Sequence, residues 1–258
     1  MDNLLNKIHF ADCLDVLRQI PDGSVDLMLT DPPYNTTQNK WEYQIDFEAL
    51  KIEWQRILKH DGAMVFTSQQ PFTTKLISSM PEIFRYSLVW EKSRAGGFLN
   101  ASRMPLIQHE DVLVFYRALP TFNPQKRKGA AFKKKAVKNG DGDNYGKFER
   151  TGKTTINLGD RFPTSIISFD NPNNDNCHPT QKPTDLFRYL IRTYSNPGDV
   201  VFDGYGGSGT TAIAAQMEGR KFIVCENHLP YFEASTARLA NLVAAPYLFS
   251  DATKMFEQ

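Results

Sequence analysis

Short runs of almost wholly apolar residues recur along the chain, and they constrain its fold more than any other feature. Seven such runs are candidate strands: residues 8–11, 25–30, 63–67, 86–90, 112–116, 200–203 and 221–225. A strand that is apolar on both faces belongs in a sheet that is covered on both sides, which is typical of parallel sheets. The pattern therefore predicts a layered α/β fold with about seven strands.

Segments with helical periodicity lie between these runs. Residues 47–58 place their apolar side chains on one helical face, with Asp46 as the expected N-cap. Residues 186–194 do the same after Thr184, which is the expected N-cap there. Further candidate helices are residues 210–217 and 231–242. We expect these helices to cover both faces of the sheet.

Composition excludes several classes of protein. A chain of 258 residues with 41% hydrophobic and 23% charged residues is typical of a folded globular protein. No apolar stretch approaches the ~18 residues of a membrane span, and residues 1–7 lack a signal-peptide pattern. Cys13, Cys177 and Cys225 are far apart, which argues against a disulfide framework or a zinc site. We therefore expect a cytoplasmic protein without a bound metal.

The alternation of strands and helices stops over residues 118–161, a stretch that holds six glycines. Within it, residues 126–153 contain ten basic and three acidic side chains, a net +7 in a chain whose total is +1. Such a local excess of positive charge indicates a polyanion partner, although a solvated loop has the same composition. We interpret residues 118–161 as an inserted recognition segment, with residues 1–117 and 162–258 as the two parts of one domain.

A glycine-rich turn follows the strand at residues 200–203. Gly204, Gly206 and Gly209 satisfy the pattern G-x-G-x-x-G, in which glycine lets the backbone approach a ligand closely. Glu226 closes the next candidate strand and is placed to accept hydrogen bonds from ribose hydroxyls. The unit predicts a ligand with an adenosine-like ribose. NAD-dependent oxidoreductases share this pattern, as do tight turns that bind no ligand.

A second motif ends the strand at residues 25–30, which runs directly into Asp31-Pro32-Pro33-Tyr34. Proline has no N–H group, so the last carbonyls of the strand stay unpaired at a rigid corner. The corner offers a carboxylate, exposed carbonyls and one aromatic face, which suits a planar base that carries an amino group. An ordinary surface turn is the alternative, because Asp and Pro are common turn residues.

Taken together, the two motifs resemble those of the DNA amino-methyltransferases, which transfer a methyl group from S-adenosyl-L-methionine to an exocyclic nitrogen of adenine or cytosine. Since D-P-P-Y comes first and the glycine loop last, the chain resembles the circularly permuted β class. Three further segments are similar to that family's motifs: residues 11–14 (ADCL), 109–115 (HEDVLVF) and 178–183 (HPTQKP). The resemblance implies a Rossmann-like methyltransferase sheet of about seven strands in circularly permuted order, with an inserted basic target-recognition segment.

One position departs from the family's D-P-F-x-G-S-G-T-T loop. The chain has Gly204 and Tyr205 where the family commonly has Pro and Phe. Glycine adds flexibility at this position, so we expect weaker cofactor binding there.

The resemblance also implies roles for individual residues. Asp31, Pro32, Pro33 and Tyr34 would form the catalytic corner, where Asp31 and the Pro32 carbonyl accept the amine hydrogens and Tyr34 stacks on a flipped base. Its cofactor contacts correspond to Asp12, Cys13, Asp31, Thr180, Gln181, Lys182, Asp203, Gly204, Tyr205, Gly206, Ser208, Gly209, Thr210, Glu226 and Asn227. For Asp12 and Cys13, a helix cap and a buried thiol are the alternative roles.

Double-stranded DNA is the implied partner. The candidate DNA contacts are Arg94, Arg103, Lys126, Arg127, Lys128, Lys133, Lys134 and Lys135. Family members with D-P-P-Y methylate adenine more often than cytosine, so N6 of adenine is the expected target and N4 of cytosine is the alternative. Carbon-5 methylation is excluded because no cysteine follows a proline.

Other interpretations stay open at this point. They are an RNA or protein methyltransferase, a nucleic-acid-binding protein with an inactive site, and an NAD-dependent oxidoreductase. A homodimer and a cognate restriction endonuclease are candidate assemblies. The expected setting is a bacterium, or the host cytoplasm if the protein is phage-encoded.

Overall fold

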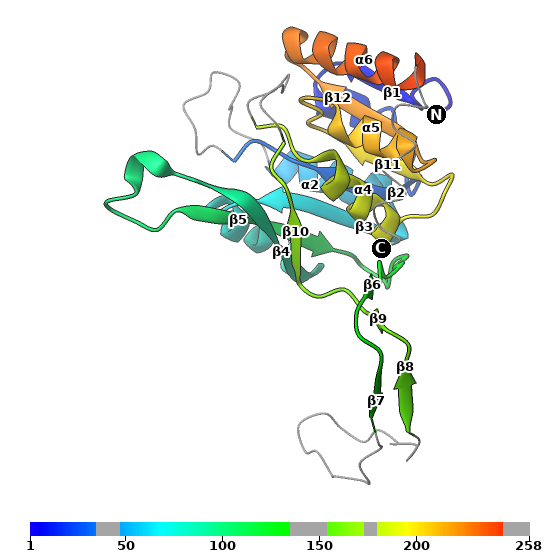
Figure 1. Ribbon diagram of the computed structural model, residues 1–258. Coiled ribbons are helices and arrows are strands. Elements are labelled where there is room, and N and C mark those ends of the chain that lie inside the picture. The colour runs from blue at the N-terminus through cyan, green and yellow to red at the C-terminus, as the bar shows by residue number, and fades with distance from the viewer. Residues whose placement is uncertain (35–46, 135–153, 173–179, 245–258) are drawn as a thin grey trace.

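A single large sheet carries both sequence motifs. The computed structural model describes residues 1–34, 47–134, 154–172 and 180–244. Its eight-stranded sheet has the order β1-β12-β11-β2-β3-β5-β4-β10 (Figure 1). The strands are β1 (Lys7–Phe10), β2 (Val25–Thr30), β3 (Leu58–Ser68), β4 (Phe84–Gly96), β5 (Ile107–Phe115), β10 (Ile166–Phe169), β11 (Val200–Asp203) and β12 (Lys221–Glu226). Only β5 runs antiparallel to its neighbours in this sheet.

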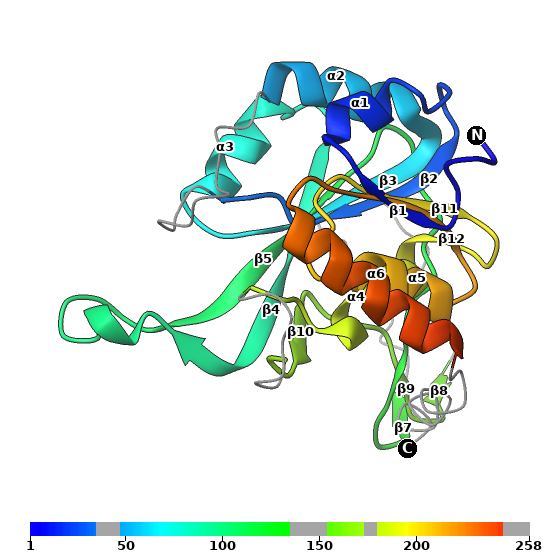
Figure 2. The ribbon, with the colours of Figure 1, turned by 90° about the horizontal axis from the view of Figure 1, so that it is seen from above.

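Helices cover both faces of the sheet, as expected. One face packs against α1 (Cys13–Leu17), α2 (Phe47–Ile57) and α3 (Phe72–Ser79), and the other against α4 (Thr184–Tyr194), α5 (Thr210–Met217) and α6 (Leu229–Ala244). Figure 2 shows the two helical layers on opposite sides of the strands. The apolar stripe of α2 explains its position, because Phe47, Leu50, Trp54 and Ile57 are all buried.

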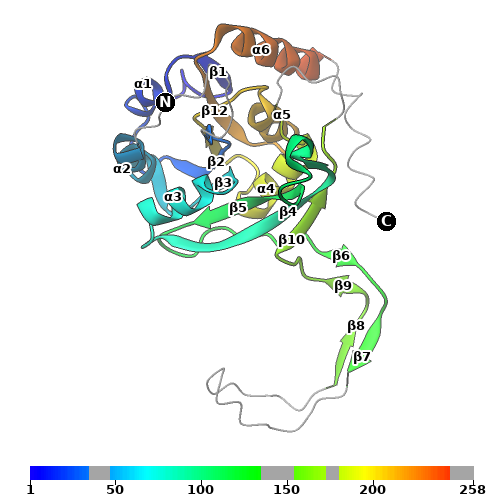
Figure 3. The ribbon, with the colours of Figure 1, turned by 90° about the vertical axis from the view of Figure 1, so that its left-hand side faces the viewer.

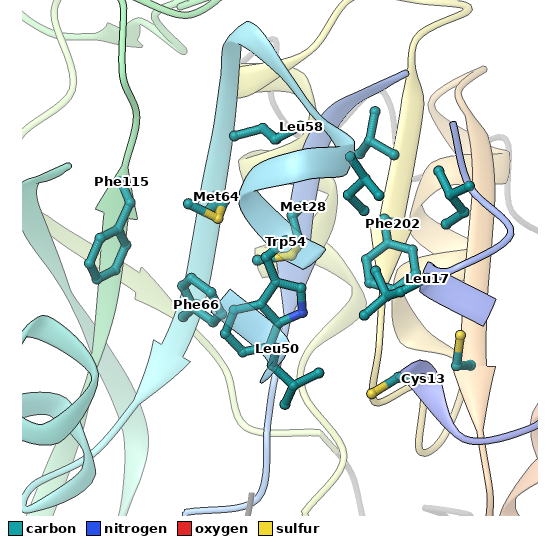
Figure 4. Close-up of a cluster of buried hydrophobic side chains, with 14 of the residues drawn as sticks. Cys13, Leu17, Met28, Leu50, Trp54, Leu58, Met64, Phe66, Phe115 and Phe202 are labelled. Atoms are coloured by element: carbon teal, nitrogen blue, oxygen red, sulfur yellow. The ribbon is translucent and has the colours of Figure 1, made fainter. Parts of the chain in front are cut away.

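The core under α1, α2 and α3 is rich in aromatic rings (Figure 4). The ring of Trp54 lies 5.3 Å from that of Phe66, and Phe66 meets Phe115 edge to face at 5.5 Å. These three residues come from α2, β3 and β5, so the cluster ties a helix to two strands. Aromatic pairs of this kind stabilise the fold by more than the burial of their apolar area alone.

The seven expected strands all lie in the sheet, and β10 is an eighth that the sequence analysis missed. β10 is an edge strand, and Ile166 in it is 56% exposed, so it lacks the apolar character of a central strand. The expected cap of α4 was wrong by one residue, because the helix begins at Thr184 and Pro183 is its N-cap. Asp46 lies outside the described residues.

Two extensions leave opposite edges of the sheet. β2, β3, β4, β11 and β12 all end at one edge, which we call the carboxyl edge, and β5 begins there and ends at the other. The hairpin between β4 and β5, with the short 3-10 helix η1 (Phe98–Asn100) at its tip, projects beyond the carboxyl edge (Figures 1 and 2).

Residues 118–134 and 154–161 form a separate arm that starts from the opposite edge (Figure 3). Its base is held to the end of α4, where the Asn123 amide donates to the carbonyl of Thr193 (2.8 Å). Two short antiparallel ladders extend from there: β6 (Arg127–Lys128) pairs with β9 (Asp160–Arg161), and β7 (Phe132–Lys134) pairs with β8 (Thr155–Asn157). None of the helices in the described residues is long and apolar enough to cross a membrane.

Candidate active site at the carboxyl edge

Asp31 lies at the end of β2 and accepts three hydrogen bonds from side chains. Its Oδ1 accepts from the hydroxyl of Tyr34 (2.7 Å) and from the hydroxyl of Thr67. Its Oδ2 accepts from the ammonium of Lys182 (2.7 Å). A carboxylate has about four acceptor positions, so the contacts within the described residues leave one position on Oδ2 for a further donor.

Lys182 belongs to a buried cluster of alternating charges. Its ammonium also lies 3.4 Å from Glu110 Oε2, and Glu110 is paired with Lys92. Burial by itself lowers the pKa of Lys182, but the carboxylates of Asp31 and Glu110 outweigh it and raise the pKa above the usual value. The two carboxylates and two ammonium groups therefore balance one another.

Tyr34 donates into the same cluster. Its hydroxyl lies 3.4 Å from Glu110 Oε2, and its ring stacks on Phe72 at 5.3 Å. Burial, with the nearby charges of Asp31 and Glu110, raises the pKa of Tyr34 well above its usual value. The hydroxyl is therefore neutral and acts as a donor, and Phe72 fixes the plane of the ring.

Asp203 joins this corner to the glycine loop. Its Oδ1 accepts from the hydroxyl of Thr30 (2.6 Å) and the amide of Tyr205 (2.9 Å), and its Oδ2 accepts from the hydroxyl of Thr211 (2.5 Å). Burial raises the pKa of Asp203 to about 6, although the donors from Thr211, Thr30 and Tyr205 oppose the shift. Because Thr30 directly precedes Asp31, one carboxylate holds the ends of β2 and β11 together.

The glycine loop packs closely against β12. A Cβ atom on Gly206 would lie 2.5 Å from the side chain of Val224, and the Gly206 amide donates to the carbonyl of Cys225 (2.7 Å). Gly209 has φ +74°, a conformation that favours glycine. At the unusual position Gly204, a Cβ would meet that of Cys13 at 3.3 Å. The close approach of Cys13 gives a packing reason for a small residue there.

Glu226 ends β12 next to the loop. Its two carboxylate oxygens accept from the amides of Gly207 and His228, each at 2.7 Å. Each oxygen keeps acceptor capacity for a further donor. This remaining capacity fits the hydroxyls of a ribose, as the sequence predicts.

Asp12 and Cys13 lie beside the same loop in structural roles. Asp12 caps α1 by accepting from the amide of Leu14 (2.9 Å). Burial, followed by the charge of Asp12, raises the pKa of Cys13 to about 12, so its thiol is neutral. Both alternatives from the sequence analysis are thus observed, and neither role prevents a ligand contact.

The carboxyl edge brings together most of the expected site residues. Asp31, Tyr34 and Lys182 meet at the end of β2, and Asp203 and Glu226 lie on either side of the glycine loop that begins at Gly204. Lys182 was expected at the cofactor, but its ammonium reaches Asp31 and its carbonyl accepts from the hydroxyl of Thr210 (3.4 Å). His178 lies outside the described residues.

The candidate DNA contacts fall into two separate groups. Arg94 and Arg103 belong to the hairpin at the carboxyl edge, where Arg94 is held by the carbonyl of Pro172 (3.0 Å). The other group belongs to the arm at the opposite edge and comprises Lys126, Arg127, Lys128, Lys133 and Lys134. Lys135 lies outside the described residues. The structure thus separates the arm from the catalytic corner.

Sequence reasoning missed several residues of the site. Glu110 and Lys92 complete the charge cluster, and Thr67 donates to Asp31. Glu110 had a signal, because Glu110 and Asp111 directly precede the apolar run at residues 112–115 and lie in the motif HEDVLVF. Within the described part of the chain, no group of three His, Cys, Asp or Glu residues is arranged to hold a metal ion.

Comparisons with known proteins agree with this geometry. The family model for N6/N4 methyltransferases, described as DNA methylase, matches residues 25–237. The chain is 30% identical to the DNA adenine methyltransferase YhdJ of Escherichia coli (strain K12) over 273 residues, which cover 98% of this chain and 88% of that protein.

Two solved structures share the fold. The M1.HpyAVI–SAM complex has a TM-score of 0.61 at 23% identity, with 90% of this chain and 98% of that chain covered. The PvuII DNA methyltransferase, described as cytosine-N4-specific, has a TM-score of 0.63 at 20% identity, with 89% and 84% covered.

Proposed function

Because the chain belongs to the N6/N4 methyltransferase family of DNA methylases, we propose that it methylates the exocyclic N6 of an adenine that is flipped out of double-stranded DNA. Its methyl donor is S-adenosylmethionine, as for the family as a whole. The observation that carries the proposal is the Asp31 carboxylate, which lies beside the glycine loop and is held by Tyr34 and Lys182.

The catalytic task is to make an amine nucleophilic. An exocyclic amine reacts poorly because its lone pair is delocalised into the ring. The free acceptor position on Asp31 Oδ2 and the carbonyl of Pro32 would each accept one N–H hydrogen, which localises the lone pair on nitrogen. When bound, the cofactor supplies an electrophilic methyl group. As the N–C bond forms, the C–S bond would break and leave a neutral thioether, and the nitrogen would become cationic. Asp31 would then accept the proton that this nitrogen sheds, and Tyr34 would hold the base by stacking.

Residues at the ends of β1, β11 and β12 would hold the cofactor. Glu226 has acceptor capacity for the ribose hydroxyls, and Asp12 and Cys13 flank the expected adenine position. The remaining expected contacts surround the loop and the start of α4: Thr180, Gln181, Lys182, Asp203, Gly204, Tyr205, Gly206, Ser208, Gly209, Thr210 and Asn227. Lys182 has a double role in this arrangement, because its ammonium also anchors Asp31.

Chain order supports assignment to the circularly permuted β class. The catalytic turn at Asp31 comes early in the chain and the glycine loop comes late, yet β2 and β11 are paired in the sheet. We also propose residues 118–161 as the inserted segment that contacts DNA, and a cytoplasmic setting in a bacterium or an infected host. A homodimer and a cognate restriction endonuclease are proposed assemblies.

Adenine is favoured over cytosine by D-P-P-Y and by the similarity to an adenine methyltransferase. The fold alone does not discriminate, since a cytosine-N4-specific enzyme shares it. The test is methyl transfer to unmethylated genomic DNA, followed by nucleoside mass spectrometry. We expect N6-methyladenine from the wild type, none from Asp31→Ala or Asp31→Asn, and wild-type levels from the exposed control Asp15→Asn.

The outcomes separate the parts of the proposal. N4-methylcytosine would overturn the choice of base and keep the catalytic carboxylate. Equal rates for the wild type and both Asp31 variants would overturn the role of Asp31. Asp31→Asn retains the contacts with Tyr34 and Thr67, so its inactivity, together with intact cofactor binding, would not reflect loss of folding.

A further inference from the structure

The hairpin between β4 and β5 extends outward from the corner at Asp31. Lys92 on β4 and Glu110 on β5 belong to the charge cluster around Asp31, and the strands still pair at Gly96 and Ile107. At about 3.3 Å per strand residue, that pair lies roughly 10 Å beyond Glu110. The tip lies farther out on the same side, where a DNA duplex must lie to deliver a base to Asp31.

The tip exposes large apolar side chains. Phe98 is 76% exposed and Leu99 is 83% exposed, and Met104 and Leu106 beside them are also exposed. The backbone of the tip is nevertheless held in successive turns. Gly97 has φ +83°, the Asn100 amide donates to the Gly97 carbonyl, and the Met104 amide donates to the Asn100 carbonyl (3.0 Å each). A fixed, clustered set of exposed apolar side chains indicates a contact with a partner.

Charge identifies the kind of partner. Residues 93–108 contain Arg94 and Arg103 and no acidic residue. Cations on both sides of an apolar tip match a polyanion whose interior is apolar, and duplex DNA has phosphates outside and stacked bases inside. Proteins that bend or open DNA insert apolar side chains between base steps in this way.

We propose that Phe98 and Leu99 form a wedge that enters the base stack beside the target base and favours its extrusion toward Asp31. This inference rests on the proposed methylation of DNA. Extrusion costs a few kcal/mol, and side chains that fill the space left in the stack lower that cost. Arg94 and Arg103 hold the phosphates on either side.

The test compares the double variant Phe98→Ala/Leu99→Ala with the control Ile52→Ala/Val243→Ala. Ile52 and Val243 are exposed apolar residues on α2 and α6, away from the hairpin. Each protein is assayed for methyl transfer on a duplex, on the same duplex with the target base mismatched, and on a single strand. Fluorescence of 2-aminopurine at the target position reports extrusion, and a thermal melt with S-adenosylmethionine reports folding and cofactor binding.

We expect the wedge variant to lose about tenfold or more in transfer to the duplex. Its transfer to the mismatched duplex and the single strand should stay near wild type, because those bases need little extrusion. The 2-aminopurine signal should fall in parallel with duplex transfer. The control variant should match the wild type on all three substrates.

Other results would overturn the wedge. One is equal loss on all three substrates, and another is unchanged transfer to the duplex. A third is conversion of a dimer to a monomer with the substrate preference unchanged, which would make the tip a contact between two copies of the chain. If the wild type itself methylates none of the DNA substrates, the proposed function fails, and that result is distinct from failure of the wedge alone.

Discussion

At the scale of single residues, Asp31 shows how the site prepares a carboxylate for one task. Tyr34, Thr67 and Lys182 occupy three of its acceptor positions. These contacts set the orientation of the group, so in the proposed reaction little reorganisation would be needed when a base binds. Glu110 extends this control, because it contacts both Lys182 and Tyr34.

Glu110→Gln tests whether Glu110 helps to position Asp31 through Lys182 and Tyr34. The substitution keeps the shape of the side chain but leaves Lys92 and Lys182 with one carboxylate fewer. Removing one partner of a buried ion pair costs on the order of 3–5 kcal/mol, so we expect a lower midpoint of urea unfolding. We also expect kcat to fall with little change in the Kd of S-adenosylmethionine, measured by calorimetry.

Glu91→Gln is the matched control, since Glu91 is the exposed neighbour of Lys92 on β4 and its carboxylate accepts a hydrogen bond from the hydroxyl of Ser168 (2.9 Å). Its stability and kcat should stay at wild-type levels. If both variants behaved alike, the charge cluster would have no special role in positioning Asp31.

The raised pKa of Asp203 predicts that the free energy of unfolding depends on pH. Burial raises its pKa from 3.8 in the unfolded chain to about 6, so the native state binds this proton more tightly. The resulting stabilisation is present below pH 3.8 and is lost as the pH rises through about 6. Asp203→Asn cannot ionise, so it should gain on the order of 2–3 kcal/mol relative to wild type between pH 4 and 7.

Urea unfolding at intervals over that pH range measures the gain. Asp15→Asn, at an exposed position on α1, is the control and should follow the wild-type curve. A difference between Asp203→Asn and wild type that stays constant with pH would show that Asp203 does not titrate there.

At the scale of elements, the glycine loop is shaped by its contact with β12 as much as by any ligand. Gly206 does not have a positive φ, so the backbone conformation does not require glycine at this position. Glycine is required because there is no room for a Cβ atom. A methyl group there would meet Val224 and the Cys225 carbonyl. The loop and the strand that carries Glu226 are thereby held in fixed register.

Gly206→Ala should therefore displace the loop from β12. We expect at least about tenfold weaker binding of S-adenosylmethionine, which corresponds to roughly 1.4 kcal/mol, with a smaller effect on the melting temperature of the protein alone. Gly96→Ala is the control, because a Cβ there meets no atom closer than 3.9 Å. Tight cofactor binding by Gly206→Ala would show that the loop adapts without loss.

At the scale of the whole molecule, the basic arm and Asp31 lie at opposite edges of the sheet. The arm leaves from the end of β5, whereas Asp31 lies at the end of β2, and these two strand ends are on opposite edges. DNA that contacts both must extend well beyond the target base, or the arm must contact DNA bound elsewhere. In either case we expect the arm to supply affinity through phosphates and not to set the geometry of the reacting base.

Replacing Lys126, Arg127, Lys128, Lys133 and Lys134 by Gln tests the arm. Each lost phosphate contact should lower the slope of log K against log salt by about 0.9, and DNA affinity at low salt should fall. Fluorescence anisotropy with a labelled duplex at several salt concentrations measures both. Affinity for S-adenosylmethionine should not change, since the arm is remote from the glycine loop.

A control variant with Lys7→Gln and Lys221→Gln removes two exposed lysines from the body at the same edge of the sheet. Its salt dependence should match wild type. If the arm variant kept the salt slope of the wild type, the positive charge of residues 126–153 would not reflect DNA binding. The segment would then be a solvated loop, which is the alternative that the sequence left open.

The sequence by itself determined the local features of this protein. It located seven strands, four of the six α-helices in the described residues, the glycine loop and the corner at Asp31, because apolar periodicity and the backbone limits of Gly and Pro act over a few residues. It did not locate α1 or α3. It missed β10, whose exposed edge position leaves little apolar signal.

Only the tertiary structure decided which residues meet. Asp31 and Lys182 are 151 positions apart, and Glu110 joins them only because β4 and β5 pair beside β3. The antiparallel direction of β5 likewise places the hairpin at the carboxyl edge and the arm at the other. Strand direction and pairing depend on long-range packing over the whole sheet, so no local stretch of sequence encodes them.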